Sequence, residues 1–152
     1  MRAVVQRNGS LRKQAVAVDV VLFTSQGGML KVLLVKRRQP PYRGMWALPG
    51  GLVGPEESVD DAALRELQEE TSISNVYLEQ LYTFGEPERD PRGRVITVAY
   101  YALGNLQQFQ LKARRRSSEA SWFAVRRLPE LAFDHRRFVD YALERLRSKR
   151  NS

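Results

Sequence analysis

The chain has 152 residues, a length that suits one domain with one hydrophobic core. It has no cysteine and one histidine, which excludes disulfides, thiolate metal sites and histidine-built zinc sites, so any metal must be held by oxygen ligands. No apolar run is long enough to span a bilayer and no signal peptide is evident, so we expect a globular, cytoplasmic protein, and its net charge of +8 predicts at least weak attraction to polyanions.

The first third of the chain predicts a β-hairpin and a short strand. Residues 14–24 are β-branched and apolar, residues 31–37 form a second apolar run, and a glycine pair at 27–28 indicates the turn between them. Residues 46–48 predict a further short strand, and Pro49-Gly50-Gly51 and a brief apolar segment follow it.

A helix is predicted next. Ser58 is a good helix N-cap, and Asp61 stands three residues later as a weak capping-box partner. Val59, Ala63 and Leu67 recur at four-residue spacing, which gives the helix one apolar stripe for packing. We expect the helix to end near residue 71.

The remainder of the chain predicts more strands, a polar loop and a final helix that Asp134 caps. The expected strands are residues 75–84, 94–103, 109–112 and 121–125, with a loop at 85–93 and a turn at 127–131. The order of strands, helix, strands and helix predicts an α/β fold with a mixed sheet sandwiched by helices.

The acidic residues are concentrated in one short stretch of this basic chain. Seven of the 17 Asp and Glu residues lie between Glu56 and Glu70. Glu66, Glu69 and Glu70 have i, i+3 and i+4 spacing, which places three carboxylates on one helix face. Their repulsion destabilises an unliganded helix, and a divalent cation reverses the sign of that interaction. Magnesium is suitable because it takes carboxylate oxygens and bridges substrate phosphates.

The same stretch resembles the signature of the Nudix hydrolase family, G-x5-E-x7-R-E-U-x-E-E-x-G-U, where U is aliphatic. The matching residues are Gly51, Glu57, Arg65, Glu66, Leu67, Glu69, Glu70 and Ile73. Ser72 stands where the pattern has its second glycine. Because glycine there allows a left-handed backbone, which serine adopts at some cost, we expect the change to affect only the end of the helix.

This resemblance implies one Nudix-type α/β/α sandwich over residues 1–152, of which 1–12 form a flexible N-terminal segment. It implies that Mg²⁺, with Mn²⁺ as an alternative, is held by Glu66, Glu69 and Glu70 together with the Gly50 carbonyl. It implies structural roles for Gly51 and for Glu57, which should brace the helix through an ion pair with Arg65. The expected catalytic set is Glu69, Glu70, Arg65 and Glu119. Glu119 is a candidate further metal ligand or general base on a loop before a strand.

The resemblance extends beyond the signature to one subgroup, the ADP-ribose pyrophosphatase-like proteins and the Nudix domains of regulators of NAD metabolism. The segments that carry it are YRGMWALPGG, YLEQLYTFGEPERDPRGRVITVAY, EASWFAVRRLPELAFDH and YALERLR. Pro87 lies fifteen residues beyond Ser72, near where a proline resembles the marker of ADP-ribose hydrolases. The chain stops about where the regulators' DNA-reading domain begins, so we expect no specific nucleic acid partner, and the subgroup favours a homodimer.

Several basic and aromatic residues are candidates for binding a nucleoside diphosphate. Arg89, Arg92 and Arg94 either contact the diphosphate or belong to a solvated charged loop, and Arg37 and Arg38 end a strand that reaches the site in similar folds. Tyr42 is a candidate for stacking on adenine, whereas Trp46 is expected in the core. His135 is assigned a structural role at a helix start.

The expected activity is metal-dependent hydrolysis of ADP-ribose to AMP and ribose 5-phosphate, with Glu69, Glu70 or Glu119 as the general base. Three alternatives remain open. The domain could sense ADP-ribose with little turnover, or it could hydrolyse another nucleotide, such as an oxidised nucleoside triphosphate or a dinucleoside polyphosphate. The third is salt-sensitive nucleic-acid binding through Lys112–Arg116 and the basic C-terminal tail.

Overall fold

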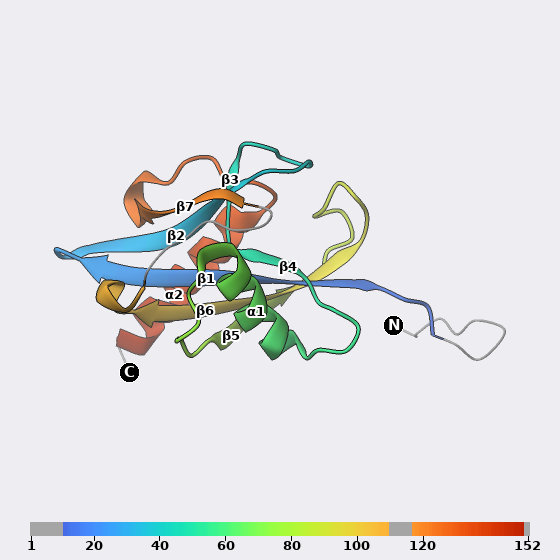
Figure 1. The fold of residues 1–152 in the computed structure, drawn as a ribbon, viewed down its shortest axis with the longest axis horizontal. Helices are drawn as coiled ribbons and strands as arrows, with labels where there is room; N and C mark the ends of the chain where they lie inside the picture. The colour runs from blue at the N-terminus through green and yellow to red at the C-terminus, as the bar shows by residue number, and fades with distance from the viewer. Residues whose placement is uncertain (1–10, 110–116, 151–152) are drawn as a thin grey trace.

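The computed structural model describes residues 11–109 and 117–150 (Figure 1). Its elements, in chain order, are β1 (Ala15–Gln26), β2 (Met29–Arg37), β3 (Trp46–Ala47), β4 (Gly50–Leu52), α1 (Val59–Thr71), β5 (Glu79–Phe84), β6 (Val95–Gly104), the 3₁₀ turn η1 (Leu106–Gln108), β7 (Ser117–Ala124), the 3₁₀ turn η2 (Val125–Arg127) and α2 (His135–Arg150). Within these ranges no helix has the length and apolar character needed to cross a membrane.

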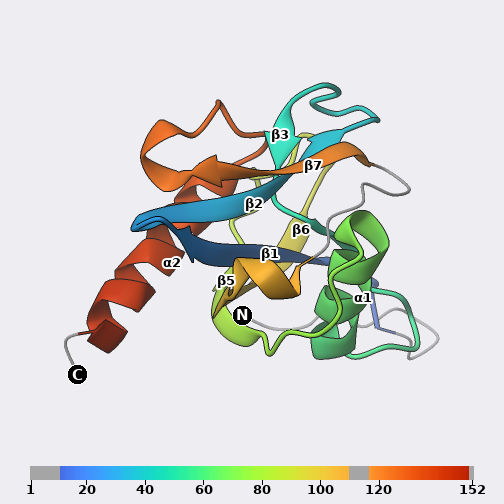
Figure 2. The same cartoon turned by 60° about the vertical axis from the view of Figure 1, so that its left-hand side comes forward.

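The strands of the described chain form one mixed sheet in the order β3-β2-β1-β6-β5. The central pair, β1 and β6, is parallel from Ala15↔Val95 to Thr24↔Gly104, and the other strand pairs are antiparallel. Two strands branch off this path, because β4 pairs with β1 and β7 pairs with β2, as the course of β7 alongside β2 in Figure 2 shows. The mixed sheet predicted from the sequence is confirmed.

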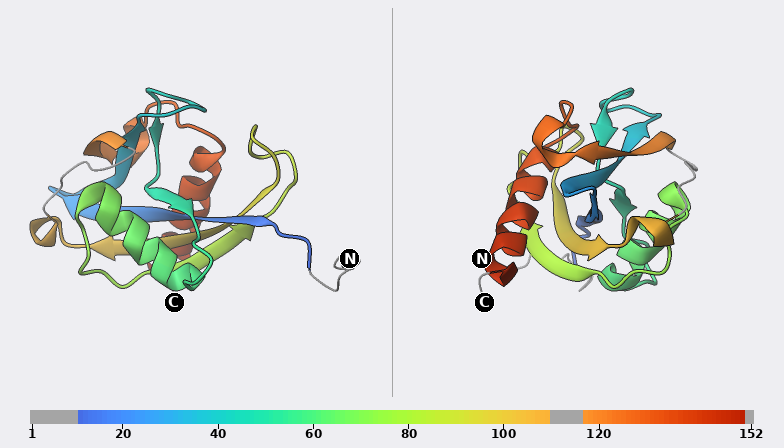
Figure 3. Two further views of the ribbon diagram at one scale, coloured as in Figure 1. Left: turned by 45° about the vertical axis from the view of Figure 1, so that its right-hand side comes forward. Right: turned by 90° about the vertical axis from the view of Figure 1, so that its left-hand side faces the viewer.

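The central strand β1 supplies both cores, because successive side chains of a strand point to opposite faces. Val18, Val20 and Leu22 pack on the side of α1, whereas Val21 and Phe23 pack on the side of α2. Figure 3 shows the two helices on opposite sides of the sheet. The continuous apolar run of β1 is typical of a strand buried on both faces, and the expected α/β/α sandwich is confirmed.

The predicted hairpin and first helix are confirmed, while several boundaries differ. β5 begins at Glu79 rather than at residue 75, and β7 begins at Ser117 rather than at residue 121. β4 was not predicted, because two of its three residues are glycine and only its pairing with β1 makes it a strand. Phe109 is outside any strand, and residues 110–112 of that predicted strand lie outside the described residues.

Two further expectations concern segments that the structure does not describe. The first ten residues of the predicted flexible N-terminal segment lie outside the described residues, as does the basic cluster Lys112–Arg116. Asp134, predicted to cap the final helix, stands directly before α2, and its Oδ1 accepts a hydrogen bond from Arg89 Nη1 at 2.9 Å. That carboxylate therefore ties the 85–94 loop to the start of α2.

Candidate functional site

The loop before α1 is fixed by side chains that the signature contains. Ser58 Oγ accepts a hydrogen bond from the Asp61 amide at 3.0 Å, which satisfies one of the free donors at the helix start. Glu57 Oε1 accepts from the Gly54 amide at 2.8 Å. The loop between β4 and α1 is thus held at both its middle and its end.

Arg65 connects this loop to the acidic face of α1. Its Nε and Nη2 donate to the two carboxylate oxygens of Glu57 at 2.9 and 2.6 Å, so the expected ion pair is present and bidentate. Hydrogen bonds from Arg65 and then from the Gly54 amide lower the pKa of Glu57 to about 2. The hydrogen bond with Glu57, and then the one with Glu66, raise the pKa of Arg65.

The three glutamates of α1 meet two different sets of partners. Arg65 Nη1 donates to Glu66 Oε1 at 2.8 Å and to Glu69 Oε2 at 3.0 Å. Glu70 Oε1 instead accepts from the Gly50 amide at 3.1 Å. Glu66 and Glu70 are buried, with 1% and 4% of their surface exposed. Within residues 11–109 and 117–150, no three Asp, Glu or His side chains are gathered into a ready-made metal cluster.

The donor set nevertheless fits a hard divalent cation. Carboxylates on one turn of a helix beside a glycine backbone offer only oxygen ligands, as Mg²⁺ and Mn²⁺ prefer. Burial of Glu66 and Glu70 makes a compensating positive charge favourable, because an unpaired carboxylate in the interior is costly. Arg65 supplies part of that charge at Glu66 and Glu69.

The backbone of Gly50 packs very closely against β1. A Cβ atom at this position would be 2.1 Å from Asp19 Oδ1 and 2.2 Å from the Val18 carbonyl oxygen, so only glycine fits. Gly50 pairs with Asp19, and Gly51 pairs with Val18, in the antiparallel contact of β4 with β1. This packing brings the Gly50 amide within reach of Glu70.

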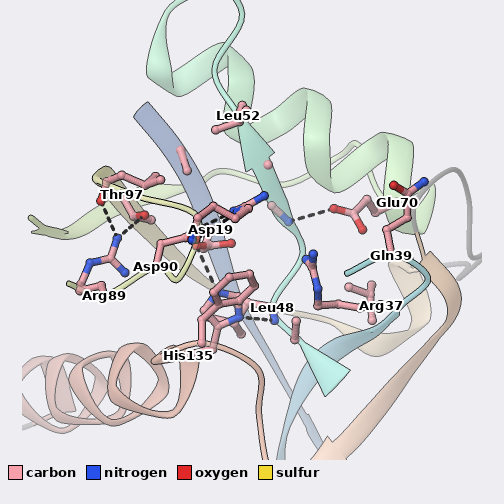
Figure 4. Close-up of a pocket in the computed structure, with 18 of the residues that line it drawn as sticks. Asp19, Arg37, Gln39, Leu48, Leu52, Glu70, Arg89, Asp90, Thr97 and His135 are labelled. Carbon is pink, nitrogen blue, oxygen red and sulfur yellow. Dashed lines mark hydrogen bonds and ion pairs between the residues drawn. The ribbon is translucent and has the colours of Figure 1, made fainter. Parts of the chain in front are cut away.

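A cavity of about 200 Å³ opens beside Glu70 and contains charges of both signs (Figure 4). Its polar and aromatic lining includes Asp19, Arg37, Gln39, Glu70, Arg89, Asp90, Arg92, Phe133 and His135. These residues come from β1, from β2 and the loop that follows it, from α1, from the 85–94 loop that carries Pro87, and from the segment that leads into α2. A carboxylate of the signature therefore shares one cavity with three guanidinium groups, an arrangement suited to an anionic ligand and a cation together.

The three cavity arginines have different surroundings. Arg37 Nε donates to the Pro41 carbonyl at 2.7 Å, and its guanidinium lies 4.9 Å from the centre of the Phe133 ring. Arg92 is paired with Asp90 at 2.7 Å and lies 5.5 Å from the same ring. Phe133 thus sits against both guanidinium groups.

Arg89 lines the cavity, but its guanidinium is hydrogen-bonded to the protein itself. Its Nη1 donates to Asp134, and its Nη2 donates to the Val95 carbonyl at 3.1 Å and to Thr97 Oγ1 at 2.6 Å. The Arg89 side chain is only 8% exposed. These contacts give Arg89 a role in holding the 85–94 loop, besides the diphosphate contact expected from the sequence.

Other predicted residues are not among those that line this cavity. Arg38 is not, and Arg94 donates to the Gly85 carbonyl at 3.0 Å. Tyr42 meets the edge of Phe133 at 4.7 Å, and Trp46 packs against Phe123, as expected for a core residue.

The position predicted for Glu119 was wrong. It lies within β7 rather than on a loop before a strand, because β7 begins at Ser117 and pairs there with β2. Its exposed carboxylate is 3.7 Å from Lys36 Nζ on the neighbouring strand. Glu119 does not line the cavity that contains Glu70.

The structure adds residues that the sequence analysis did not assign to the site. Asp19 is 9% exposed, and its carboxylate faces His135 Nε2 at 3.4 Å. A charged residue inside an apolar strand was a usable signal, because a buried carboxylate needs a partner. Asp90 and Phe133 had no such signal, since their loops meet only in the folded chain.

Comparison with known proteins gives matches along most of the chain. A NUDIX domain model matches residues 13–142. The ADPR-responsive transcriptional repressor NtrR of Acinetobacter baylyi is 38% identical over 136 residues, which cover 87% of this chain and 54% of the repressor. An ADP-ribose pyrophosphatase of Methanocaldococcus jannaschii is 39% identical over 130 residues, which cover 84% of this chain and 72% of the enzyme. The chain thus spans about half of the repressor and about three quarters of the enzyme.

Solved structures give the same result. The NUDIX domain of Shewanella oneidensis NrtR complexed with ADP ribose has a TM-score of 0.81 and 40% identity, with 89% of this chain and 90% of that chain covered. A MutT/nudix family protein from Enterococcus faecalis has a TM-score of 0.83 and 34% identity, with 90% and 63% covered. Together with the glutamates and arginine of the signature on α1, these matches show that the chain belongs to the Nudix family.

Proposed function

We propose that the protein hydrolyses the diphosphate of ADP-ribose to give AMP and ribose 5-phosphate. The observation that carries the proposal is the shared cavity of Glu70, Arg37 and Arg92, which offers a carboxylate ligand and two cations to one diphosphate. Similarity to an ADP-ribose pyrophosphatase and to a domain complexed with ADP ribose supports this choice of substrate.

Glu66, Glu69 and Glu70, with the Gly50 carbonyl, would hold Mg²⁺, and Mn²⁺ would fit the same oxygen donors. When bound, the ion supplies neutralisation of diphosphate charge and acidifies water. Arg65 orients Glu66 and Glu69, while the Gly50 amide orients Glu70.

In the reaction, water attacks one phosphorus, the bridging phosphorus–oxygen bond breaks, and a carboxylate takes the proton of the water. Glu70 lines the cavity and Glu69 is its neighbour on α1, so both remain candidates for the general base. Glu119 is a weaker candidate, because it is absent from the cavity lining and lies beside Lys36. Arg37 and Arg92 are the best-placed groups for the diphosphate oxygens.

A second candidate function is sensing of ADP-ribose with little turnover. The observation that favours it is the similarity to a transcriptional repressor described as ADPR-responsive. This chain covers about half of the length of that repressor. Turnover separates the two candidates, because a sensor needs the cavity but not the chemistry.

The test is incubation with ADP-ribose in Mg²⁺ and in excess EDTA, followed by chromatography. We expect AMP and ribose 5-phosphate only with Mg²⁺. Glu70→Gln should lower kcat by about a hundredfold or more, because one metal ligand loses its charge. The glutamine oxygen can still accept from the Gly50 amide, so the fold should persist. Glu130→Gln, at an exposed position away from the cavity, is the matched control.

Each outcome leads to a different conclusion. A near-normal rate in Glu70→Gln contradicts the metal role of Glu70. Binding of ADP-ribose by calorimetry without turnover supports the sensor. Absence of both binding and turnover contradicts both candidates and favours other nucleotides as substrates, such as oxidised nucleoside triphosphates and dinucleoside polyphosphates. Light scattering on the same preparation checks the predicted homodimer.

A further inference from the structure

The Leu48–Gly50 segment links the start of α2 to the acidic face of α1. At one end the Leu48 amide donates to His135 Nδ1 at 3.0 Å. In the middle, the Pro49 carbonyl accepts from the Val20 amide at 2.9 Å. At the other end, the Gly50 amide donates to Glu70 Oε1 at 3.1 Å. Figure 4 shows His135 and Glu70 reaching this segment from opposite directions.

The hydrogen bond from Leu48 fixes the state of the His135 ring. Because Nδ1 accepts a hydrogen bond, the ring proton lies on Nε2, which faces Asp19 Oδ2 at 3.4 Å. The ring is only 7% exposed and packs near Phe133 and Phe138, with ring centres 5.3 and 5.4 Å away. The imidazole is therefore packed beside two aromatic rings and contacted at both nitrogens.

Leu48 depends on this acceptor. The residue is 3% exposed, so loss of the imidazole leaves a buried backbone N–H without its partner. Such a group is unfavourable by about 1–3 kcal/mol, which drives the segment to shift until the amide finds another acceptor.

The segment has little room to shift without moving the site. Gly50 packs so closely on β1 that a Cβ atom would lie 2.1 Å from Asp19 Oδ1. A displacement at Leu48 therefore passes to Gly50, whose amide holds Glu70.

We propose that His135 is a positioning residue for the metal-binding side of the cavity, acting through the Leu48–Gly50 segment on Gly50 and Glu70. This inference rests on the proposed function, because it takes Glu70 and Gly50 as metal ligands. His135 would then have a role in addition to the structural role at the start of α2 that was predicted from the sequence. Partners of this kind around metal ligands typically change metal affinity or activity by about 10–100-fold when removed.

The test compares His135→Phe with His135→Asn. Phenylalanine keeps a packed ring but has no acceptor for the Leu48 amide, whereas the asparagine oxygen can occupy the place of Nδ1. We expect His135→Phe to weaken Mn²⁺ binding, measured by calorimetry without substrate, by about tenfold. With ADP-ribose and Mg²⁺, kcat should fall similarly while KM changes less than about threefold. His135→Asn should stay within about threefold of the wild type in both measurements.

A control separates positioning from general loss of stability. Thr24 is a buried residue that donates a hydrogen bond to the Gly104 carbonyl at 2.9 Å, and it is absent from the cavity lining. Thr24→Val should lower the melting temperature without weakening Mn²⁺ binding. If Thr24→Val weakens binding as much as His135→Phe at equal fraction folded, the positioning role is overturned.

A measurement on the wild type keeps the proposal testable if the variants do not fold. Addition of Mg²⁺ to ¹⁵N-labelled protein should shift His135 Nδ1 and the amides of Leu48 and Gly50. Unchanged His135 and Leu48 signals, full Mn²⁺ binding by His135→Phe, or equal losses in His135→Phe and His135→Asn each overturn it. Failure of the wild type to hydrolyse ADP-ribose, with Mn²⁺ binding that Glu70→Gln abolishes, overturns the proposed function alone. Absence of Mn²⁺ binding overturns both.

Discussion

Ser72 is the residue at which this chain departs from the family signature, and its backbone shows what the departure entails. Its φ of 71° is left-handed, and its amide donates to the Gln68 carbonyl to close the end of α1. The serine therefore adopts the conformation that glycine adopts without steric strain. Within the described chain its buried hydroxyl also has no hydrogen-bond partner.

Replacement of Ser72 by glycine should stabilise the protein by about 1 kcal/mol, because the strain of a side chain at positive φ is removed. For a domain of this size that corresponds to a rise of about 2–4 °C in melting temperature. Calorimetric melts check the value, and turnover should be unchanged. Ser72→Ala loses the unpartnered hydroxyl but keeps the strain. An alanine variant as stable as the glycine variant would show that the backbone contributes nothing.

At the scale of the element, Arg65 offsets part of the negative charge on the acidic face of α1. One guanidinium contacts three carboxylates, those of Glu57, Glu66 and Glu69. The repulsion expected from three glutamates on one face is thus partly relieved within the chain. A divalent cation bound by the same oxygens should contribute in the same direction.

Arg65→Ala should destabilise the protein by about 2–4 kcal/mol, somewhat less than for a fully buried pair because the Arg65 side chain is 32% exposed. Saturating Mg²⁺ should restore part of this loss, since it supplies positive charge to Glu66 and Glu69. Urea unfolding with and without Mg²⁺ measures both effects. Arg136→Ala, which removes an exposed pair with Asp140, is the control and should show little change. If Mg²⁺ raised the stability of the Arg65→Ala and Arg136→Ala variants equally, its assignment to Glu66 and Glu69 would be contradicted.

At the scale of the whole molecule, ion pairs between elements determine how the fold responds to acid. Glu57 joins its loop to α1 through Arg65, and Glu86 joins the 85–94 loop to α2 through Arg137 at 2.6 Å. Hydrogen bonds from these arginines lower the pKa of each glutamate from 4.5 to about 2. A carboxylate whose pKa is lowered in the folded state stabilises the fold at pH values above its ordinary pKa of 4.5. This contribution is lost as the pH falls towards 2.

The melting temperature of the wild type should therefore fall as the pH is lowered from about 5 to 2. The melting temperature of a Glu57→Gln/Glu86→Gln double variant should fall less over the same range. The difference in melting temperature between the wild type and the double variant should be constant above pH 5 and should become smaller towards pH 2. Thermal melts across this range measure the curves. Parallel curves down to pH 2 would contradict a role for these two carboxylates.

The sequence by itself determined the features of this protein that depend on near neighbours along the chain. The cap at Ser58, the apolar stripe of α1 and the face of Glu66, Glu69 and Glu70 follow from helical spacing alone. The long apolar run of residues 14–24 likewise indicated a buried strand, which is β1.

Only the tertiary structure decided which distant residues share the cavity. His135 meets Leu48 across 87 positions, Phe133 meets Arg37 and Arg92, and β4 becomes a strand only against β1. Glu119 fell on the wrong kind of element because the start of β7 is set by pairing with β2. The physical reason is that helix spacing is a local property, whereas strand pairing and buried polar contacts depend on which segments the sheet brings together.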